Sequence, residues 1–174
     1  EIRSLASITK LMTAIVLMDL PIIWSNTTTI IEADGGSDEL ANEGEIFTLD
    51  DLWHLALIGS SNKTTNALVR MSGLNKEDFV KRMNTKARVL HLPSLRFMEP
   101  TGLSDKNMGN ISDIAELLRS ALRFDKIYTT LRIGEYYARP LNKEKARRVW
   151  STDWLLTNWI PNDFNKKNIA GKTG

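Results

Sequence analysis

The sequence predicts an α+β fold that is mostly helical and forms one domain. Apolar residues recur at helical spacing over several long stretches, while the β-branched runs between them are short enough for single strands. No internal repeat or low-complexity linker divides the 174 residues. Because 42% of the residues are hydrophobic and 25% are charged, the chain can bury a core of ordinary size.

Capping and turn signals predict the elements of the first half. Apolar residues follow helical spacing from Ser7 until Pro21, which cannot continue a helix. Thr48, with Asp51 three residues later, is typical of a helix start, and Gly59 should break that helix. The expected elements are a helix over 7–20, strands at 27–31 and 45–48, a helix that begins at 49 and ends near Gly59, and a helix over 62–71.

The second half is predicted in the same way. Asn75 should cap a helix, since Glu77 and Asp78 follow in its first turn, where negative charge favours the positive end of the helix dipole. The stretch 97–110 contains several glycine and proline turn signals and should be loop. The expected elements are a helix over 76–90, a helix capped by Ser112 that runs to 124, a strand over 147–156, a turn at 161–163 and a strand over 168–174.

The residue inventory excludes several kinds of chemistry. Cysteine is absent, which excludes disulfides, thiol nucleophiles, thiolate zinc sites and iron–sulfur clusters. His54 and His91 lie far apart, and neither belongs to a His-Glu-x-x-His metal pattern. A base for proton transfer should therefore not be histidine, and His54 is expected to pack on its helix. Core or cap packing is also favoured over a sugar- or peptide-binding groove for Trp150, Trp154 and Trp159.

Charge and hydropathy favour neither a nucleic-acid partner nor a membrane span. The net charge is +2, from 23 Lys and Arg against 21 Asp and Glu, and it is evenly spread. The basic stretch 143–148 and the acidic stretch 34–45 are both expected to be solvated. No apolar run reaches the roughly 18 residues that cross a bilayer, so 11–23 should be a buried helix. The chain starts at Glu1 without a Met, and the missing signal peptide therefore says nothing about location.

Three short patterns carry candidate chemistry: Ser7-Ile8-Thr9-Lys10, Ser60-Ser61-Asn62 and Lys172-Thr173-Gly174. The first places a hydroxyl and an amine three residues apart at a helix start, within hydrogen-bonding reach. A serine nucleophile needs this geometry when an amine accepts its proton, and the positive helix end favours an oxyanion beside it. The Lys10 amine must be neutral for this role, which burial or a second cation such as Lys172 would favour.

Each pattern alone is weak evidence. Taken separately, Ser7 and Asn62 are each better interpreted as helix caps, whereas an exposed strand end is only the unfavoured alternative for Lys172. At average residue frequencies, all three patterns in this order should occur in well under about one chain in a hundred. The combination is therefore the informative observation.

This motif set resembles that of the low-molecular-mass penicillin-binding proteins, the serine D-alanyl-D-alanine carboxypeptidases and endopeptidases. The likeness covers segments 6–14, 55–62 and 97–104 and the helix after Ile111, and it is weakest over 133–168. Within the family it looks closest to the endopeptidases of the Gram-negative periplasm. The resemblance implies a β-lactamase/DD-peptidase-like transpeptidase fold, a sheet flanked by helices, with no metal or cofactor.

The resemblance also implies the catalytic residues. Ser7 would be the nucleophile that attacks the carbonyl of the penultimate D-alanine and forms an acyl-enzyme. Lys10 would accept the proton of Ser7. Ser60 would bridge hydrogen bonds between the two lysines and help to protonate the leaving group.

The remaining motif residues are implied to bind substrate. Asn62 would hold the substrate amide, and Lys172 and Thr173 would face its carboxylate in a charge-assisted contact. Gly174 would leave room for the substrate backbone along the strand edge. The implied partners are peptidoglycan stem peptides, and β-lactams would acylate the same serine because they resemble the D-alanyl-D-alanine end.

Other protein classes fit the sequence less well. A class A β-lactamase needs a glutamate in a Glu-x-x-Leu-Asn setting, whereas Glu99 lies in Glu-Pro-Thr-Gly-Leu, the peptidase pattern. A phosphate-binding loop would need glycine at Lys166, and the hydrolase elbow Gly-x-Ser-x-Gly fails at Lys63. A non-catalytic sensor module that keeps the motifs is the rival from another class. The choice between carboxypeptidase and endopeptidase stays open.

The ends of the chain suggest a partial catalytic domain. Six residues precede Ser7 and none follow Gly174, so the resemblance implies that 1–174 is the mainly helical part, from first to third motif, with most of the flanking antiparallel sheet missing. One oxyanion donor of the family would lie beyond Gly174, and this piece is not expected to be stable or active alone. The absence of cysteine fits an extracytoplasmic, periplasmic location in a bacterium.

Overall fold

The computed structural model describes residues 1–157 and 170–174. The chain divides into two compact units, unit 1 (Glu1–Ile22, Val69–Ile127 and Gly174) and unit 2 (Ile23–Leu68 and Tyr128–Thr173). The elements are β1 (Ile2–Ser4), a 3-10 turn (Ala6–Ile8), α1 (Thr9–Met18), β2 (Thr27–Thr29), a 3-10 turn (Glu32–Asp34), β3 (Ile46–Thr48), α2 (Leu49–Leu57), α3 (Asn62–Met71), α4 (Lys76–Val89), β4 (Met108–Asn110), α5 (Ile111–Ala121), α6 (Asp125–Thr130), β5 (Glu135–Ala138), β6 (Arg147–Trp150) and α7 (Trp154–Thr157).

The prediction of an α+β fold is confirmed. Within the described residues the strands form three separate two-stranded antiparallel sheets, β1–β4, β2–β3 and β5–β6. Helices supply most of the remaining regular structure. In the same described part, no helix combines the length and apolar character needed to cross a bilayer.

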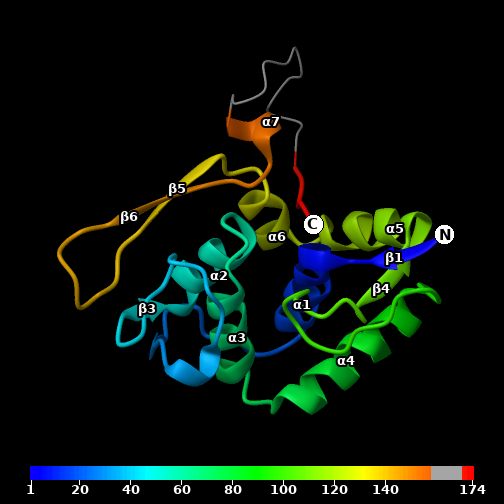
Figure 1. The fold of residues 1–174 in the computed structure, drawn as a ribbon, viewed down its shortest axis with the longest axis horizontal. Coiled ribbons are helices and arrows are strands. Elements are labelled where there is room, and N and C mark those ends of the chain that lie inside the picture. Colours follow the sequence, from blue (N-terminus) through cyan, green and yellow to red (C-terminus); the bar gives the residue numbers. More distant parts are fainter. Residues whose placement is uncertain (158–169) are drawn as a thin grey trace. The chain divides into compact units, whose positions relative to one another are not determined.

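Unit 1 is built around α1. Every residue of α1 from Thr9 to Leu17 is buried, and α4 and α5 both pack against this helix. Strand β1 pairs with β4, with Arg3 opposite Gly109, and the two strands lie side by side in Figure 1. Strand β1 leads directly into the 3-10 turn Ala6–Ile8, so the sheet fixes the entry of the chain into α1.

Helix α4 begins where the sequence predicts. The Asn75 side chain accepts a hydrogen bond of 2.8 Å from the backbone N–H of Asp78, which satisfies one of the free donors at the helix start. The buried residues Phe79, Met83 and Ala87 recur every four positions and form the face of α4 turned to the core.

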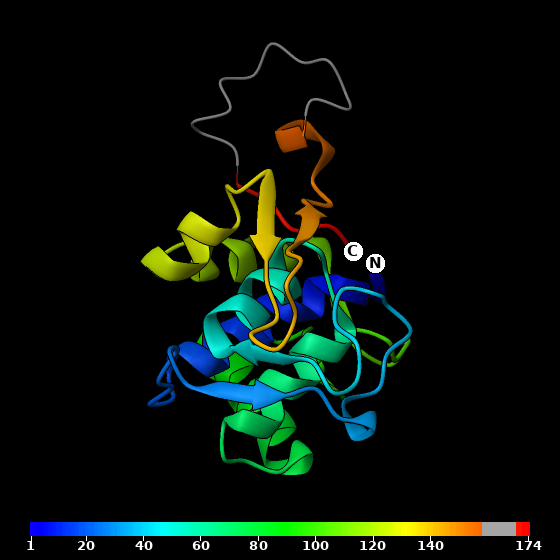
Figure 2. The ribbon, with the colours of Figure 1, turned by 90° about the vertical axis from the view of Figure 1, so that its left-hand side faces the viewer.

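Unit 2 contains the hairpin β2–β3 and helix α2. Thr48 caps α2 as predicted, accepting from the backbone N–H of Asp51 at 3.0 Å. The buried Trp53 donates its indole N–H to Thr130 Oγ1 at 2.8 Å and meets Trp24 edge-on, with ring centroids 5.0 Å apart. Strands β5 and β6 run side by side in Figure 2 (yellow and orange).

The prediction that the charged stretches 34–45 and 143–148 are solvated is only partly right: most of their residues are exposed, but Asp34 and Glu45 are buried. Glu45 is 4% exposed and forms a bidentate ion pair with Arg147, with N–O distances of 2.9 and 3.0 Å. Burial raises the pKa of Glu45, but hydrogen bonds from Arg147 and Asn42 outweigh it and hold the pKa below the ordinary value. Asp34 is also buried, and its carboxylate accepts from the backbone N–H of Ile31.

Four other predictions of local structure are wrong or only partly right. Asn110 caps α5, two residues before the predicted Ser112, because its side chain reaches the backbone N–H of Asp113. The loop predicted over 97–110 ends in strand β4. The strand expected over 147–156 ends at Trp150, and α7 follows it. Residues 170–174 form no strand, while 168–169 and the turn at 161–163 lie outside the described residues.

The Asn75 cap makes a stability prediction. Replacing Asn75 by Ala in the full-length protein removes the acceptor for the Asp78 N–H and should lower the free energy of unfolding by about 1 kcal/mol. Urea unfolding measures the change. Asn75→Ser retains a capping oxygen and should restore most of the loss; equal destabilisation by both variants would contradict the capping account.

Candidate active site

In unit 1 the structure brings Ser7 and Lys10 together. Lys10 Nζ lies 3.1 Å from Ser7 Oγ, within hydrogen-bonding distance. Lys10 is 1% exposed, although lysine is among the side chains least often buried. The buried amine beside a serine hydroxyl is the arrangement that proton transfer from serine to lysine requires.

The backbone around Ser7 explains this placement. Ser7 lies in the 3-10 turn Ala6–Ile8, which runs directly into α1, and Ala6 has a positive φ of 43°. No side chain caps this turn or the start of α1, so the interpretation of Ser7 as an N-cap is wrong. The 3-10 turn instead leaves the hydroxyl near Lys10, one helical turn further on.

A loop of unit 1, Glu99–Asn107, holds the other side of Lys10. Lys10 Nζ donates to the Thr101 carbonyl at 2.7 Å, and Thr13, one turn later on α1, donates to the Pro100 carbonyl at 2.6 Å. Both acceptors are backbone groups of the segment whose sequence matched the peptidase pattern. The loop and α1 are therefore joined at two successive turns.

Gly102 brings the loop against the nucleophile turn. Its φ is +95°, and a Cβ at this position would lie 1.8 Å from the Ala6 carbonyl oxygen and 2.9 Å from the Ser7 nitrogen. Only glycine fits here, both for its backbone conformation and for the space.

In unit 2 the structure brings Ser60 and Lys172 together. Lys172 Nζ donates to Ser60 Oγ at 2.9 Å and to the Thr173 carbonyl at 2.8 Å. Lys172 is therefore not a simple exposed strand end, the alternative that the sequence did not favour, since its amine is bound to the second motif. Ser60 has a φ of +60°, an uncommon value for serine and a strain that tends to occur at functional sites.

Asp38 supports the second motif and was missed by sequence reasoning, which treated it as part of a solvated loop. Its carboxylate accepts from Ser61 Oγ at 2.7 Å and from the backbone N–H groups of Asn62 and Lys63 at 3.0 and 3.3 Å. Ser61 Oγ in turn accepts from the Thr64 N–H at 3.1 Å. Ser61 and Asp38 therefore cap α3. The interpretation of Asn62 as a helix cap is wrong.

The third motif lies against the end of β6 and the start of α7. Thr173 Oγ1 donates to Thr152 Oγ1 at 2.6 Å, and a Cβ on Gly171 would lie 2.5 Å from an Asp153 carboxylate oxygen. A cavity of about 530 Å³ borders Thr173 and is lined also by Thr152, Asp153, Trp154 and Leu155. Trp154 is 54% exposed and Trp150 37%, so the prediction that they pack in the core is wrong; Trp159 lies outside the described residues.

Gly174 lies in unit 1, close to the nucleophile turn. A Cβ on Gly174 would meet Ile8 Cγ1 at 2.7 Å and the Leu5 carbonyl at 2.9 Å. A side chain at 174 would therefore push against the residues that flank Ser7. Room for a substrate backbone, the role implied by the resemblance, stays a prediction.

The histidine of α2 is packed, as predicted. His54 stacks on Tyr136 with ring centroids 4.4 Å apart, and His54 Nδ1 lies 2.7 Å from the Asp50 carbonyl. Burial, together with a hydrogen bond to Asp51, raises the pKa of Tyr136 above its usual range, so this phenol stays neutral. Among residues 1–157 and 170–174, no three His, Asp or Glu side chains group as ligands for a metal.

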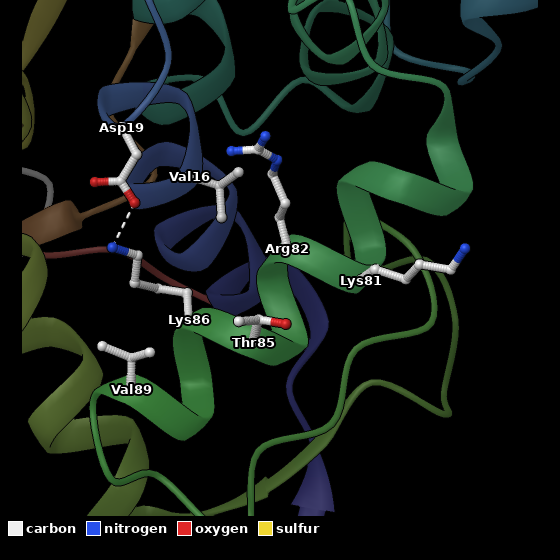
Figure 3. A pocket seen from close by; sticks show the side chains of 7 residues that line it. All are labelled: Val16, Asp19, Lys81, Arg82, Thr85, Lys86 and Val89. Carbon is white, nitrogen blue, oxygen red and sulfur yellow. Dashed lines mark ion pairs between the residues drawn. The ribbon is translucent and has the colours of Figure 1, made fainter.

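Unit 1 also has a cavity of about 360 Å³ away from Ser7, at the far end of α1 (Figure 3). Lys86 on α4 pairs there with Asp19, the C-cap of α1, and Val16 lies beside them. A cation at a helix C-terminus is electrostatically favourable, so this pair helps to hold α4 on α1. Lys81 also lines this cavity, and its amine pairs with Glu77 and Asp78.

Comparison with known proteins gives a family match over the whole chain. Residues 1–174 match the family model described as D-alanyl-D-alanine carboxypeptidase, peptidase S11. A D-alanyl-D-alanine endopeptidase of Pseudomonas aeruginosa is 35% identical over 128 residues, which are 69% of this chain and 40% of the relative. A D-alanyl-D-alanine carboxypeptidase of Bacillus subtilis is 29% identical over 96% of this chain and 45% of the relative. The chain thus spans under half the length of these relatives.

Solved structures support the fold. A mutant of the Streptomyces K15 DD-transpeptidase superposes with a TM-score of 0.81 at 22% identity, over 91% of this chain and 68% of the other. A D-alanyl-D-alanine carboxypeptidase of Mycobacterium tuberculosis gives a TM-score of 0.80 at 21% identity, over 91% and 61%. The prediction of a DD-peptidase-like transpeptidase fold is confirmed.

The contact at Gly102 predicts a large effect of one methyl group. Gly102→Ala should slow acylation of Ser7 by a fluorescent penicillin by about 100-fold, because the Cβ displaces the Ala6 and Ser7 backbone. The matched control is Gly73→Ala, since Gly73 also has a positive φ (+80°) but a Cβ there meets nothing within 4 Å. Similar rates for the two variants would show that space at Gly102 is unimportant.

The Asp38 cap predicts a local effect on α3. Asp38→Ala should destabilise the full-length protein by about 1–3 kcal/mol and speed hydrogen exchange at the Asn62 and Lys63 amides, which lose their acceptor. Glu39→Ala, at the exposed neighbouring position, is the control and should change neither quantity. Unchanged exchange at both amides in Asp38→Ala would refute the cap.

Proposed function

Because the chain belongs to the D-alanyl-D-alanine carboxypeptidase family, peptidase S11, we propose that the protein is a serine D,D-peptidase. It cleaves the bond that follows a D-alanine in peptidoglycan stem peptides, D-alanyl-D-alanine or D-alanyl-diaminopimelate, through an acyl-enzyme on Ser7. The observation that supports this proposal most directly is the buried Lys10 amine, which lies 3.1 Å from the Ser7 hydroxyl and takes the place of a histidine base.

Acylation proceeds with Lys10 as the base. The neutral amine takes the Ser7 proton as Oγ attacks the carbonyl carbon of the D-alanine. The tetrahedral intermediate then collapses, the C–N bond breaks, and the leaving amine receives a proton. Water attacks the resulting ester and restores Ser7, which releases the shortened peptide.

The motif residues of unit 2 are proposed to serve the leaving group and the substrate. Ser60, hydrogen-bonded to Lys172, passes a proton toward the leaving amine. Asn62 binds the substrate amide, and Lys172 with Thr173 faces the substrate carboxylate, a charge-assisted contact. Gly174 keeps space for the substrate backbone. Residues 1–174 are proposed to be one partial catalytic domain, which contains these residues together with Ser7 and Lys10.

The chemistry of Glu99 argues against the β-lactamase alternative. Its two carboxylate oxygens accept five hydrogen bonds from protein donors, more than the roughly four acceptor positions of a carboxylate. It therefore has no acceptor position left to activate a deacylating water. A long-lived penicillin adduct is expected, which makes β-lactams covalent inhibitors. A periplasmic or other extracytoplasmic location in a bacterium follows from the proposed substrate.

Ser7→Ala should abolish covalent labelling of the full-length protein by a fluorescent penicillin, because the acyl acceptor is removed. Labelling is read as fluorescence after denaturing electrophoresis. Ser112→Ala, at an exposed position of α5, is the control and should label fully. Undiminished labelling of Ser7→Ala would exclude Ser7 as the nucleophile.

Product analysis separates the proposed enzyme from a sensor module. The full-length protein is incubated with purified muropeptides and the products are resolved by mass. Free D-alanine indicates carboxypeptidase action, and conversion of cross-linked dimers to monomers indicates endopeptidase action. A protein that binds penicillin but produces neither would be a sensor, which would contradict the proposed hydrolysis.

A further inference from the structure

We propose that Glu99 is a positioning residue for catalysis: it shapes the loop whose Thr101 carbonyl holds the Lys10 amine in line with Ser7. The inference rests on the proposed function, since it assigns a task within the same reaction. Glu99 itself makes no hydrogen bond to Ser7 or Lys10 among the described contacts. Its effect passes through the backbone of the segment that follows it.

Glu99 binds several donors of the loop that follows it. Glu99 Oε2 accepts from the Thr101 backbone N–H at 2.7 Å and from Thr101 Oγ1 at 2.5 Å. Glu99 Oε1 accepts from the backbone N–H groups of Gly102 at 2.5 Å and Ser104 at 3.4 Å. One side chain thus binds three backbone N–H groups within four residues of the loop.

The buried Asn107 closes the loop. Its side-chain NH₂ donates to Glu99 Oε1 at 2.8 Å, to the Glu99 carbonyl at 2.9 Å and to Thr9 Oγ1 on α1 at 3.1 Å. Its carbonyl Oδ1 accepts from the backbone N–H of Met98 at 2.7 Å. Asn107 therefore links Glu99 to the helix turn that lies between Ser7 and Lys10.

The backbone of Thr101 joins this network to the amine. Thr101 donates its N–H to Glu99 and accepts from Lys10 Nζ at its carbonyl, at 2.7 Å. The Gly102 N–H, which belongs to the same peptide group as that carbonyl, also donates to Glu99. An amine that acts as a base must direct its lone pair at the hydroxyl proton, and fixing one N–H to a carbonyl restricts its rotation. The position of the Thr101 carbonyl thus controls the alignment of Lys10 Nζ with Ser7 Oγ, 3.1 Å away.

The environment keeps Glu99 in the ionised form that the donors require. Burial raises the pKa of Glu99, but the hydrogen bonds from Thr101, Gly102 and Ser104 outweigh it and hold the pKa below its ordinary value of 4.5. A lowered pKa means that Glu99 contributes stability above about pH 4.5 and that this contribution is lost as the pH falls through its folded pKa. At neutral pH the carboxylate is therefore an acceptor only.

The test is Glu99→Gln in the full-length protein. The amide keeps the size but replaces one acceptor oxygen by an NH₂ group that faces donors, so the loop must shift. The rate constant of the covalent step with a fluorescent penicillin should fall by about 10- to 100-fold, while labelling still reaches one adduct per chain and the affinity of the noncovalent complex changes little. Glu77→Gln, on the exposed side of α4, is the matched control and should react like the wild type.

The outcomes separate this inference from its premise. A wild-type protein that forms no adduct would overturn the proposed function. A wild type that reacts, with Glu99→Gln reacting at the same rate, would overturn the positioning role alone. A lowered adduct yield with an unchanged rate would also overturn it, because that result describes a loss of folded protein and not a misaligned base.

Thr101→Val tests the positioning role of Glu99 if Glu99→Gln does not fold. It removes one of the five donors to Glu99, together with the acceptor of the Leu103 N–H, and keeps the Glu99 carboxylate and the Thr101 carbonyl. The covalent step should slow by about 3- to 10-fold at full adduct yield, since one hydrogen bond to a charged group is lost. A wild-type rate in Thr101→Val would overturn the proposal.

Discussion

The hydrogen bond from the buried Lys10 amine to the Thr101 carbonyl is the interaction on which the Ser7 half of the site depends. A buried amine needs polar partners, because burial without them is costly. Here one partner is the hydroxyl of the nucleophile and another is a loop carbonyl. The same contacts that stabilise Lys10 in the core therefore also align its amine with the Ser7 hydroxyl. Burial of Lys10 and its proposed role as a base require the same position of the amine.

Two carboxylates that take no part in bond making organise the motif segments. Glu99 binds the backbone of the loop that contacts α1, and Asp38 binds the backbone at the start of α3, beside Ser60. Each carboxylate accepts several N–H donors, and such charge-assisted hydrogen bonds are stronger than neutral ones. The strained backbone at Ala6 and Ser60 is tolerated next to these anchored segments.

Sequence reasoning succeeded where the determinant is local. The caps at Thr48 and Asn75 act over three residues, and the approach of Lys10 to Ser7 follows from one helical turn. It failed where the partner is distant in sequence. Asp38 lies 24 residues from Asn62 and Arg147 lies 102 from Glu45, and no local pattern reveals such pairs. A strand near 170 also needs a neighbouring strand, whereas the Gly171 N–H turns to the Leu131 carbonyl.

Mapping the penicillin adduct on the full-length protein tests the central claim most directly. Trypsin should cut after Arg3 and Lys10, so the peptide between these sites contains Ser7 and can be sequenced by fragmentation in a mass spectrometer. The account predicts that the added mass is on Ser7. Finding it on Ser60, or on any other residue, would contradict the assignment of Ser7 and Lys10 as the reacting pair.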